Sequence, residues 1–335
     1  MSSSLVADVN LANLRRVLVV KPSSLGDIVH ALPVVHDLKM AHPHLEIAWI
    51  ANSEWLPLLR QHPHLAKTIE FPRQKFRGLR GLGAIGWLLH LHHDFRADVV
   101  LDLQGLFRSG LISWLSYGRK RIGMRDAREG ARHFYHYAID VPTNVHAVDR
   151  YRTVVQALGV NTEEPAVFTL PPGESVPYQI PTNYVALHPF SRGDGKSMTP
   201  AQVEAFCAQA KQPVVVLGRC DPSVTRDLRL PSNCPNLLNA TSIPQLIDCL
   251  RKARLVISVD SGPMHLAAAL KPEAVLSIHT WSDPRKVGPY APDAWVWKAG
   301  QIQQRHVMLP EVCTQNQTFT GKDVGSLLDW VHDRS

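Results

Sequence analysis

The sequence predicts an α/β protein built from two doubly wound parallel-sheet domains, and three observations lead to this prediction. Short apolar, β-branched runs alternate with segments of helical periodicity, as in parallel sheets covered by helices on both faces. The segment 161–181 (NTEEPAVFTLPPGESVPYQIP) is rich in proline and has no helical period, which indicates a linker. The length of 335 residues is about twice that of a common domain.

The first half carries three runs typical of buried strands. They are VLVV at 17–20, EIAWIA at 46–51 and DVVLDL at 98–103. Apolar residues at helical spacing occur after each of these runs or further along, at 28–39, 105–115 and 145–158. We therefore expect a first domain over residues 1–165, followed by a linker over 166–182.

The second half repeats this alternation. Its strand-like runs are YVALH at 184–188, PVVVLG at 213–218 and RLVISVD at 254–260. Helical periodicity is present at 200–209 and 244–251. These segments predict a second α/β domain over residues 183–335.

The positive charge of the chain is concentrated in the first half. Overall, 36 Lys and Arg face 29 Asp and Glu, and the stretch from Arg60 to Arg132 holds 14 of the basic residues but 6 of the acidic ones. Two basic clusters, FPRQKFRGLR at 71–80 and GRKRIGMRDAREGAR at 118–132, account for most of this surplus. Such a surplus favours an anionic partner, whether phosphate, nucleic acid or an acidic membrane surface. A solvated surface is the alternative for either cluster.

Cysteine usage and the N-terminal residues indicate a cytoplasmic protein. The five cysteines form no CxxC pair, their odd number leaves a thiol unpaired, and none has a nearby histidine that would suggest structural zinc. The first twenty residues lack a basic segment followed by an apolar stretch, and no run reaches the ~18 apolar residues of a membrane-spanning helix.

The first motif with chemical content is VLVVKPSSLGDIVHALPVV. An apolar strand ends at a tight loop that contains Ser23 and Ser24, and a helix begins near Asp27. Ligands of open α/β sheets bind at the carboxyl ends of strands, where helix N–H groups and Ser hydroxyls meet anionic or sugar oxygens. Asp27 is either a residue that caps the helix or a base that takes a proton from an incoming hydroxyl.

The second motif, RLVISVDSGPMHLAAAL, has the same strand, loop and helix order. Asp260, Ser261 and Gly262 follow the strand, and a proline suits the first turn of a helix that includes His265. Gly262 allows an anion close to the backbone, and Ser261 with the first-turn N–H groups meets it at the positive end of the helix. This arrangement predicts a phosphate site, with an ordinary capped helix as the alternative.

A third loop, HPFSRGDGKSMTPAQVEAF, carries Lys196 between a strand end and a helix that starts near Pro200. A lysine in this position neutralises a diphosphate if it reaches one. The alternative is an ordinary solvated lysine.

Together these motifs resemble those of glycosyltransferase family 9, the ADP-heptose:lipopolysaccharide heptosyltransferases. The similarity also includes LDLQGLFRSGL at 101–111 and SDPRKVGPY at 282–290. The stretch AREGARHFYHYAIDVPTNVHAVDRYR at 127–152 resembles a segment of the heptosyltransferase I branch. The resemblance implies a GT-B fold, in which two Rossmann-like domains face a cleft.

The resemblance also implies a mechanism. Asp27 would be the general base of a single inverting displacement, and Lys196 with the Ser261 helix end would stabilise the departing diphosphate, so that neither a metal nor a cofactor is needed. The donor substrate would be ADP-heptose, held mainly by the second domain. The expected donor-binding residues are Ser23, Ser24, Asp221, Asp260, Ser261, Gly262 and His265.

The acceptor implied by the resemblance is the acidic Kdo inner core of lipopolysaccharide, a membrane glycolipid. The first domain would hold it, and the protein would associate peripherally with the cytoplasmic face of the inner membrane. The candidate acceptor-binding residues are Arg73, Lys75, Arg128, His146 and Arg150.

Three departures from the family pattern bear on the donor. The loop at Lys196 lacks the family's tryptophan, Asp221 stands nearest to the position of a ribose-contacting glutamate, and Trp281-Ser282-Asp283 replaces a more usual Gly-Pro-Thr-Asp. A family 9 transferase of another sugar is one alternative, and a nucleotide-sugar hydrolase or epimerase, which shares the GT-B layout, is another. A nucleic-acid binder is a weaker one, because few aromatic residues lie among the basic ones.

Overall fold

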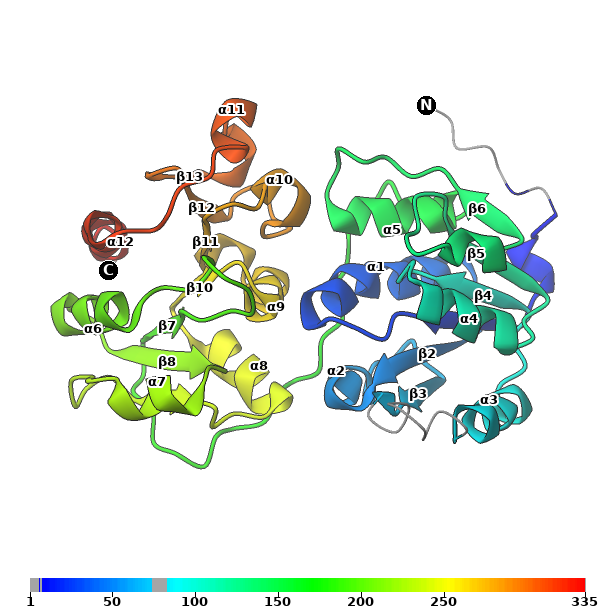
Figure 1. Ribbon diagram of the computed structural model, residues 1–335, viewed down its shortest axis with the longest axis horizontal. Helices are drawn as coiled ribbons and strands as arrows, with labels where there is room; N and C mark the ends of the chain where they lie inside the picture. Colours follow the sequence, from blue (N-terminus) through cyan, green and yellow to red (C-terminus); the bar gives the residue numbers. More distant parts are fainter. Residues whose placement is uncertain (1–5, 7, 74–82, 335) are drawn as a thin grey trace. The chain divides into compact units, whose positions relative to one another are not determined.

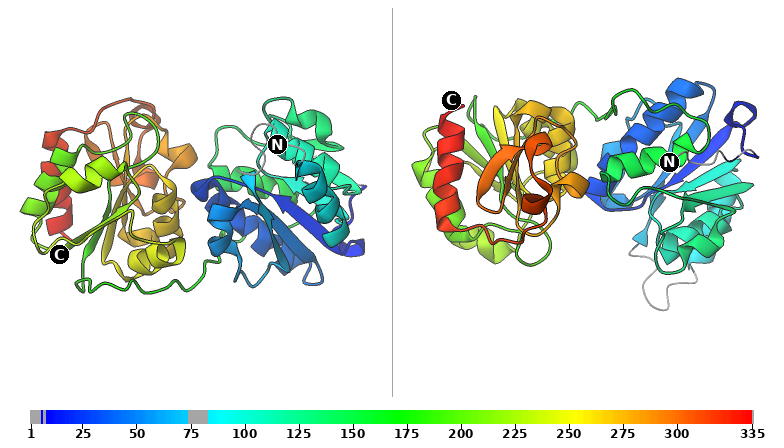
Figure 2. Two further views of the ribbon diagram at one scale, coloured as in Figure 1. Left: turned by 60° about the horizontal axis from the view of Figure 1, so that its bottom comes forward. Right: turned by 90° about the horizontal axis from the view of Figure 1, so that it is seen from above.

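The structure, a computed structural model, describes residues 6, 8–73 and 83–334. The chain divides into two compact units, residues 1–171 and 172–335. In each unit a largely parallel sheet carries helices on both faces (Figures 1 and 2). No helix or strand lies between Gln156 and Val185, the part of the chain that contains the proline-rich segment.

The first unit is built on six parallel strands. In chain order they are β1 (Arg16–Val20), β2 (Glu46–Asn52), β3 (Lys67–Phe71), β4 (Val99–Asp102), β5 (Lys120–Met124) and β6 (Tyr137–Ile139). Their order in the sheet is β3-β2-β1-β4-β5-β6. The central strand β1 is buried from Val17 to Val20 because helices cover both of its faces, which explains its unbroken apolar run.

Helices of the first unit pack in pairs against the sheet. The α-helices are α1 (Leu25–Ala41), α2 (Leu56–Leu59), α3 (Gly83–Asp94), α4 (Phe107–Leu115) and α5 (Ala147–Gln156), and the short 3₁₀ turns are η1 (Leu11–Asn13), η2 (Ser53–Trp55) and η5 (Ala131–Phe134). Helix α1 contacts α5, and α3 contacts α4. The doubly wound arrangement expected from the sequence is confirmed for this unit.

The second unit repeats this strand order. Its strands are β7 (Val185–His188), β8 (Val214–Gly218), β9 (Asn236–Leu238), β10 (Leu255–Val259), β11 (Val275–His279), β12 (Trp295–Lys298) and β13 (Gln301–Gln304). They are arranged as β9-β8-β7-β10-β11-β12-β13, and all are parallel except β13, which runs antiparallel to β12. Both sheets therefore have the Rossmann order.

The helices of the second unit also have clear sequence signals. They are α6 (Pro200–Gln209), α7 (Pro222–Asp227), α8 (Ile243–Lys252), α9 (Gly262–Leu270), α10 (Pro284–Val287), α11 (Pro310–Cys313) and α12 (Gly321–His332), with 3₁₀ turns η6 (Pro272–Ala274) and η7 (Arg305–Val307). Thr199 and Ser242 begin α6 and α8 with capping boxes completed by Gln202 and Gln245. Helix α6 contacts α12, and α8 contacts α9.

Within the part of the chain that the structure describes, no helix combines the length and apolar character needed to cross a bilayer.

A buried ion pair ties α1 to α5 in the first unit. The Arg152 guanidinium donates to both carboxylate oxygens of Asp37, at 2.7 and 3.2 Å, and both side chains are largely buried. Removing one partner leaves the other charge in a desolvated site, so we expect Asp37→Asn to lower the free energy of unfolding by about 3 kcal/mol. Urea unfolding measures this. The exposed Arg125–Asp140 pair supplies the control, and an equally large loss in Asp140→Asn would contradict this account.

Candidate active site

Asp27 in the first unit, and Lys196 with Asp260 in the second, lie where the strand order of their sheet reverses direction. In the first sheet the reversal lies between β1 and β4, and in the second it lies between β7 and β10. Open α/β sheets bind ligands at this switch point, outside the carboxyl ends of the strands. Asp27 follows β1, whereas Lys196 follows β7 and Asp260 follows β10.

Asp27 lies in the first turn of α1 and completes a capping box with Ser24. Its Oδ2 accepts hydrogen bonds from the Ser24 backbone N–H at 3.0 Å and from the Ser24 hydroxyl at 2.8 Å. Ser24, not Asp27, is the N-cap residue. The Asp27 side chain nevertheless remains 41% exposed, so the carboxylate serves the helix and is also accessible from solvent.

A buried lysine lies behind this carboxylate. Lys21 follows β1, and its Nζ donates to the Leu103 carbonyl at 3.0 Å and to the Tyr151 hydroxyl at 2.8 Å. Its Nζ lies 3.9 Å from Oδ1 of Asp27. Burial lowers the pKa of Lys21, but its neighbours Tyr151 and Asp27 outweigh that effect and raise the pKa above its usual value. Lys21 is therefore a fixed positive charge that stabilises the Asp27 carboxylate.

The loop after β4 is held by a buried carboxylate. Asp102 accepts from the backbone N–H groups of Gln104 at 2.9 Å and Gly105 at 3.1 Å, and from the Tyr135 hydroxyl at 2.7 Å. Gly105 has a φ of +68°, a left-handed conformation that favours glycine. Gln104 in turn accepts from the Ser23 N–H at 3.3 Å. The LDLQG motif thus orders the loop that faces Ser23.

The proposed acceptor residues differ in accessibility. Arg73 and Arg128 are exposed, in the segments after β3 and β5, and Arg150 in α5 is paired with Asp126. His146 is buried, and it is the N-cap residue of α5, where its Nδ1 accepts from the Val148 N–H at 3.2 Å. Lys75 lies outside the described residues. The structure thus gives His146 a structural contact at this edge, whereas the two arginines face solvent.

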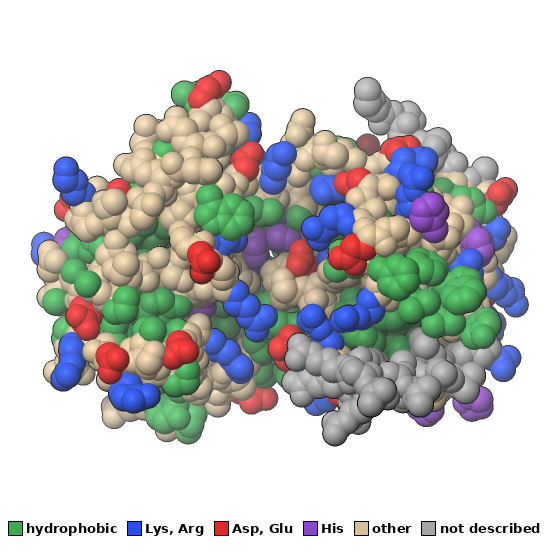
Figure 3. All heavy atoms as spheres, viewed as in Figure 1, with side chains coloured by type: hydrophobic (Ala, Val, Ile, Leu, Met, Phe, Trp, Pro, Cys, Tyr) green, Lys and Arg blue, Asp and Glu red, His purple; other side chains and the backbone are tan. Residues whose placement is uncertain are grey.

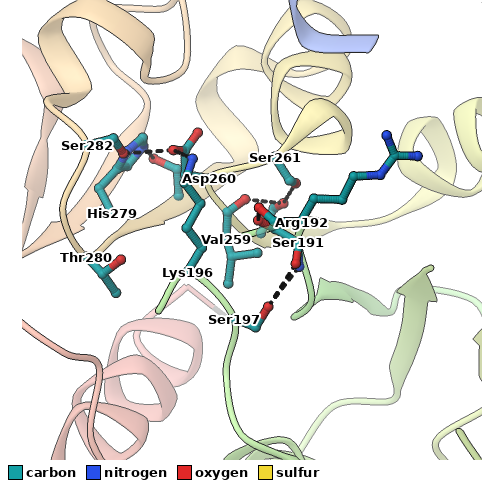
Figure 4. Close-up of polar contacts among 12 residues, drawn as sticks. Ser191, Arg192, Lys196, Ser197, Val259, Asp260, Ser261, His279, Thr280 and Ser282 are labelled. Carbon is teal, nitrogen blue, oxygen red and sulfur yellow. Dashed lines mark hydrogen bonds and ion pairs between the residues drawn. The ribbon is translucent and has the colours of Figure 1, made fainter. Parts of the chain in front are cut away.

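In the second unit, Lys196 and Asp260 bridge the two loops of the switch point (Figure 4). The Lys196 ammonium donates to Asp260 Oδ2 at 2.6 Å, and the Ser282 hydroxyl donates to the same oxygen at 2.8 Å. Burial raises the pKa of Asp260, but the nearby His279 and Lys196 outweigh it and lower the pKa below its usual value. Lys196 is therefore not the solvated lysine of the alternative interpretation.

Further buried groups support the loop after β11. His279 Nδ1 lies 2.8 Å from the Ser282 Oγ, and its Nε2 lies 3.1 Å from the Ser277 Oγ. The buried Lys298 ammonium donates to the carbonyls of Thr280 at 3.2 Å and Ser282 at 3.1 Å. These contacts hold Ser282 in place, and the Ser282 hydroxyl in turn orients the Asp260 carboxylate.

Ser261, the N-cap residue of α9, makes its side-chain contacts outside that helix. The Ser261 hydroxyl does not cap the helix but lies 3.2 Å from His188 Nδ1 and 3.2 Å from the Ser258 hydroxyl. Gly262 is the first residue of α9, and His265 is buried in its first turn. The helix N-terminus thus lies beside the Lys196–Asp260 pair, as a phosphate site requires.

Lys196 also contacts an aromatic ring. Its Nζ lies 4.4 Å from the centre of the Trp281 ring, which is half-exposed. The loop that carries Lys196 contains Gly193 and Gly195, with φ of +99° and +73°, so it turns in conformations that favour glycine. Ser197 closes this loop by accepting from the Ser191 N–H at 2.9 Å.

Asp221 is exposed after β8 and caps the short helix α7. Its Oδ1 accepts from the Ser223 backbone N–H at 2.9 Å and the Ser223 hydroxyl at 2.6 Å, and the hydrogen bonds from Ser223 lower the pKa of Asp221. The structure therefore places Asp221 at the same sheet edge as Lys196, with a capping contact already made.

Sequence reasoning missed several buried supports of both sites: Lys21, Asp102, Tyr151, His188, His279 and Lys298. The available signal was their position, since Lys21, Asp102, His188, His279 and Lys298 each end or directly follow a strand. Among residues 6, 8–73 and 83–334, no group of three or more His, Cys, Asp or Glu side chains is arranged to hold a metal ion.

Two Rossmann-type units, each with candidate residues at the switch point of its sheet, are the architecture of the GT-B fold. Escherichia coli heptosyltransferase WaaC with ADP matches 96% of this chain and 100% of its own, with a TM-score of 0.73 and 20% identity. A glycosyl transferase family 9 structure from Veillonella parvula covers 98% of this chain and 99% of its own, with a TM-score of 0.75 and 16% identity. The expected GT-B fold is confirmed.

The family model of glycosyltransferase family 9 (heptosyltransferase) matches residues 93–313, and the chain belongs to this family of enzymes. Lipopolysaccharide heptosyltransferase 1 of Pseudomonas aeruginosa is 29% identical, over 82% of this chain and 81% of its own. Lipopolysaccharide core heptosyltransferase OpsX of Haemophilus influenzae is 24% identical, over 81% of each chain. The resemblance inferred from the motifs is thus confirmed.

The buried histidines of the second unit predict a pH dependence of stability. Burial lowers the pKa of His188 and of His279 from 6.5 to about 4 in each case. Between these values the unfolded chain binds protons that the folded chain does not, so stability is fully present above pH 6.5 and falls as the pH drops toward 4, by about 3 kcal/mol or less per imidazole.

Urea unfolding at several pH values measures this slope, and His279→Asn should reduce it. The same substitution at the half-exposed His306 is the control for the loss of an imidazole side chain. Equal slopes in wild type and His279→Asn would show that His279 does not contribute.

Proposed function

We propose that this enzyme transfers a heptose from ADP-heptose to the acidic Kdo inner core of lipopolysaccharide. Family membership supports heptosyl transfer, and the names of the relatives point to lipopolysaccharide as the product. The observation that carries the proposal is the pair of switch-point sites. One offers an accessible carboxylate, Asp27, and the other offers a lysine at a helix N-terminus, Lys196.

The second unit holds the donor. The diphosphate lies at the first turn of α9, where Gly262 allows close approach, Ser261 and His265 lie alongside, and Lys196 adds a positive charge. Asp260 keeps Lys196 in place. Asp221, after β8, contacts the ribose in place of the family's glutamate. The solved structure of a relative with ADP supports the same class of ligand here.

The first unit holds the acceptor. Arg73 and Arg128 are exposed, Arg150 lies in the first turn of α5, and Asp27 lies at the same carboxyl edge of the sheet. We assign these arginines, with Lys75, to the acidic groups of the acceptor. His146 acts through the start of α5 and so positions Arg150. Ser23 and Ser24 line the approach to Asp27 and contact the donor sugar during transfer.

The transfer is a single displacement. The Asp27 carboxylate takes the proton of an acceptor hydroxyl while that oxygen attacks the anomeric carbon of the heptose. The bond from that carbon to the diphosphate oxygen breaks, and ADP leaves with the electron pair on the opposite face, so the configuration inverts. Lys196 and the helix end stabilise the growing negative charge, and the reaction as proposed uses no metal and no cofactor.

We place the enzyme in the cytoplasm, peripherally bound to the inner membrane. The donor is a soluble nucleotide sugar and the acceptor is a membrane glycolipid, so the enzyme must meet both at the membrane surface. The basic surplus between Arg60 and Arg132 suits such an anionic surface, and the small number of aromatic residues among the basic ones disfavours nucleic acid.

The donor assignment predicts that Lys196→Ala weakens ADP binding about tenfold or more, because it removes a charged hydrogen-bond donor to phosphate. Isothermal titration with ADP measures the dissociation constant. Lys252→Ala, which removes a lysine paired with Asp248 in the same unit, is the control and should bind ADP normally.

The double variant Lys196→Ala/Asp260→Asn separates two roles of the lysine. If Lys196 contacts the diphosphate, the double variant stays weak. Recovery of wild-type affinity would show instead that Lys196 only neutralises Asp260.

The mechanism predicts that Asp27→Asn lowers the transfer rate by about 10²–10⁴-fold, since an amide does not accept the proton. ADP affinity and the melting temperature should change little, because the amide oxygen still closes the capping box with Ser24. Transfer of radiolabelled heptose to a Kdo-containing acceptor measures the rate.

Asp323→Asn is the matched control. Asp323 closes a capping box with Thr320 at the start of α12, in the same way as Asp27 closes one with Ser24. Transfer by Asp27→Asn within threefold of that by Asp323→Asn would remove Asp27 from the chemistry.

A further inference from the structure

Helix α4 of the first unit differs from an ordinary amphipathic surface helix, because its buried side is the more polar one and its exposed side is the more apolar one. Its buried side carries one apolar residue, Ile112, among the small and polar residues Ser109, Gly110 and Ser113, and continues to Ser116 just after the helix. The serine hydroxyls find partners close by: Ser113 donates to the Ser109 carbonyl at 2.8 Å, and Ser116 to the Ser113 carbonyl at 2.7 Å. The serine hydroxyls on the inward side of α4 thus have hydrogen-bond partners in the helix itself.

The outward side is apolar. Phe107, Leu111 and Trp114 have the spacing of one helical stripe, and Phe107 is 51% exposed while Trp114 is 50% exposed. Phe134 of η5 joins them, with ring centres 5.4 Å from Phe107 and 6.3 Å from Trp114. We call these four residues the aromatic face. Figure 3 shows hydrophobic side chains gathered over this part of the first unit.

The aromatic face requires a glycine beneath it, at Gly110. A Cβ on Gly110 would lie 2.6 Å from the Phe134 ring, so glycine is what lets that ring settle on the helix. The absence of a side chain at Gly110 therefore allows the aromatic rings to cluster at the surface of α4. A contiguous apolar surface of this kind marks a binding site for an apolar partner.

Basic side chains flank the aromatic face. Arg108 follows Phe107 in α4, Arg132 precedes Phe134 in η5, and both are exposed. The nearby carboxylate of Glu129 accepts from the Phe107 backbone N–H at 3.2 Å. Aromatic rings beside arginines suit the interface of an anionic bilayer, where rings enter the headgroup region and guanidinium groups meet phosphates.

We propose that the aromatic face is the surface by which the first unit lies on an anionic phospholipid bilayer. This deepens the membrane association proposed above by naming the residues that make it. The face begins beside the proposed acceptor residues, since Phe107 starts α4 directly after the β4 loop and the Arg128 N–H donates to the Gly105 carbonyl at 2.8 Å. A glycolipid headgroup at this bilayer surface would thus meet the edge that carries Asp27.

The test is cosedimentation of the full chain with vesicles of phosphatidylglycerol and phosphatidylethanolamine, and with vesicles of phosphatidylcholine. Wild type should bind the anionic vesicles about tenfold or more tightly than the neutral ones. Phe107→Ser/Trp114→Ser should lose about tenfold or more of that binding, because two aromatic rings no longer enter the bilayer. Arg108→Glu/Arg132→Glu should lose binding mainly at low salt.

Val307→Ser/Leu309→Ser is the matched control, because these apolar side chains of the second unit are 54% and 62% exposed. It should bind like wild type. Thermal melting checks that each variant folds, and quenching by brominated lipid that is stronger in wild type than in Trp114→Phe would place this ring in the bilayer. Lys196→Ala should still bind vesicles, so that a failure of the proposed donor site can be told apart from a failure of the proposed membrane surface.

Three results would overturn the proposal. They are wild type that does not bind anionic vesicles, an equal loss in the control and the aromatic variant, and a wild-type dimer that Phe107→Ser/Trp114→Ser dissociates. The last result would assign the face to a second copy of the chain.

Discussion

The organisation of this enzyme follows from one constraint, the parallel direction of its strands. In a parallel sheet every strand ends at the same edge, and the helix that returns the chain starts there. Loops that are far apart in sequence are therefore brought together with helix N-termini beside them. Where the strand order reverses, two such loops diverge and leave room for a ligand. Asp27 occupies this position in one unit and Lys196 in the other.

Each of these two side chains also has a buried group of opposite charge beside it, held in place by hydrogen bonds. Lys21 is buried against Tyr151 and lies near Asp27. Asp260 is buried and holds Lys196. A buried ion loses its hydration, so it persists only where hydrogen bonds and opposite charges replace the lost water. The partners of Lys21 and Asp260 supply that replacement, so the side chains of Asp27 and Lys196 lie beside groups that are held in place.

The parts of the fold that the sequence predicted are those whose strands are buried on both faces. The buried run of β1 and the run at β8 contain no polar side chain, and β10 contains only the buried Ser258, which is the pattern of a central parallel strand. Strands such as β5 and β13, nearer the sheet edges, were missed because residues such as Lys120 and Gln303 need not be apolar where solvent reaches them. The buried strand β11 was also missed, since Ser277 and His279 interrupt its apolar run.

The site was predictable where a residue lies within a local motif, as Asp27 and Ser261 do. It was not predictable where a contact joins distant segments. Nothing in the local sequence of Lys21 shows that Tyr151 will cover it, and nothing near Asp260 shows that Ser282 will donate to it. The position of His146 was not predictable either, since nothing in the local sequence shows that its ring is buried at the start of α5.

The account depends most on the claim that the nucleotide binds at the switch point of the second sheet. Amide hydrogen exchange of the full chain with and without ADP tests it directly. The account predicts protection by ADP in two segments, 190–198 after β7 and 260–266 at the start of α9, which the Lys196–Asp260 pair joins. Protection confined to the opposite edge of the same sheet, at 210–213 and 252–254, or no protection in either loop, would contradict it.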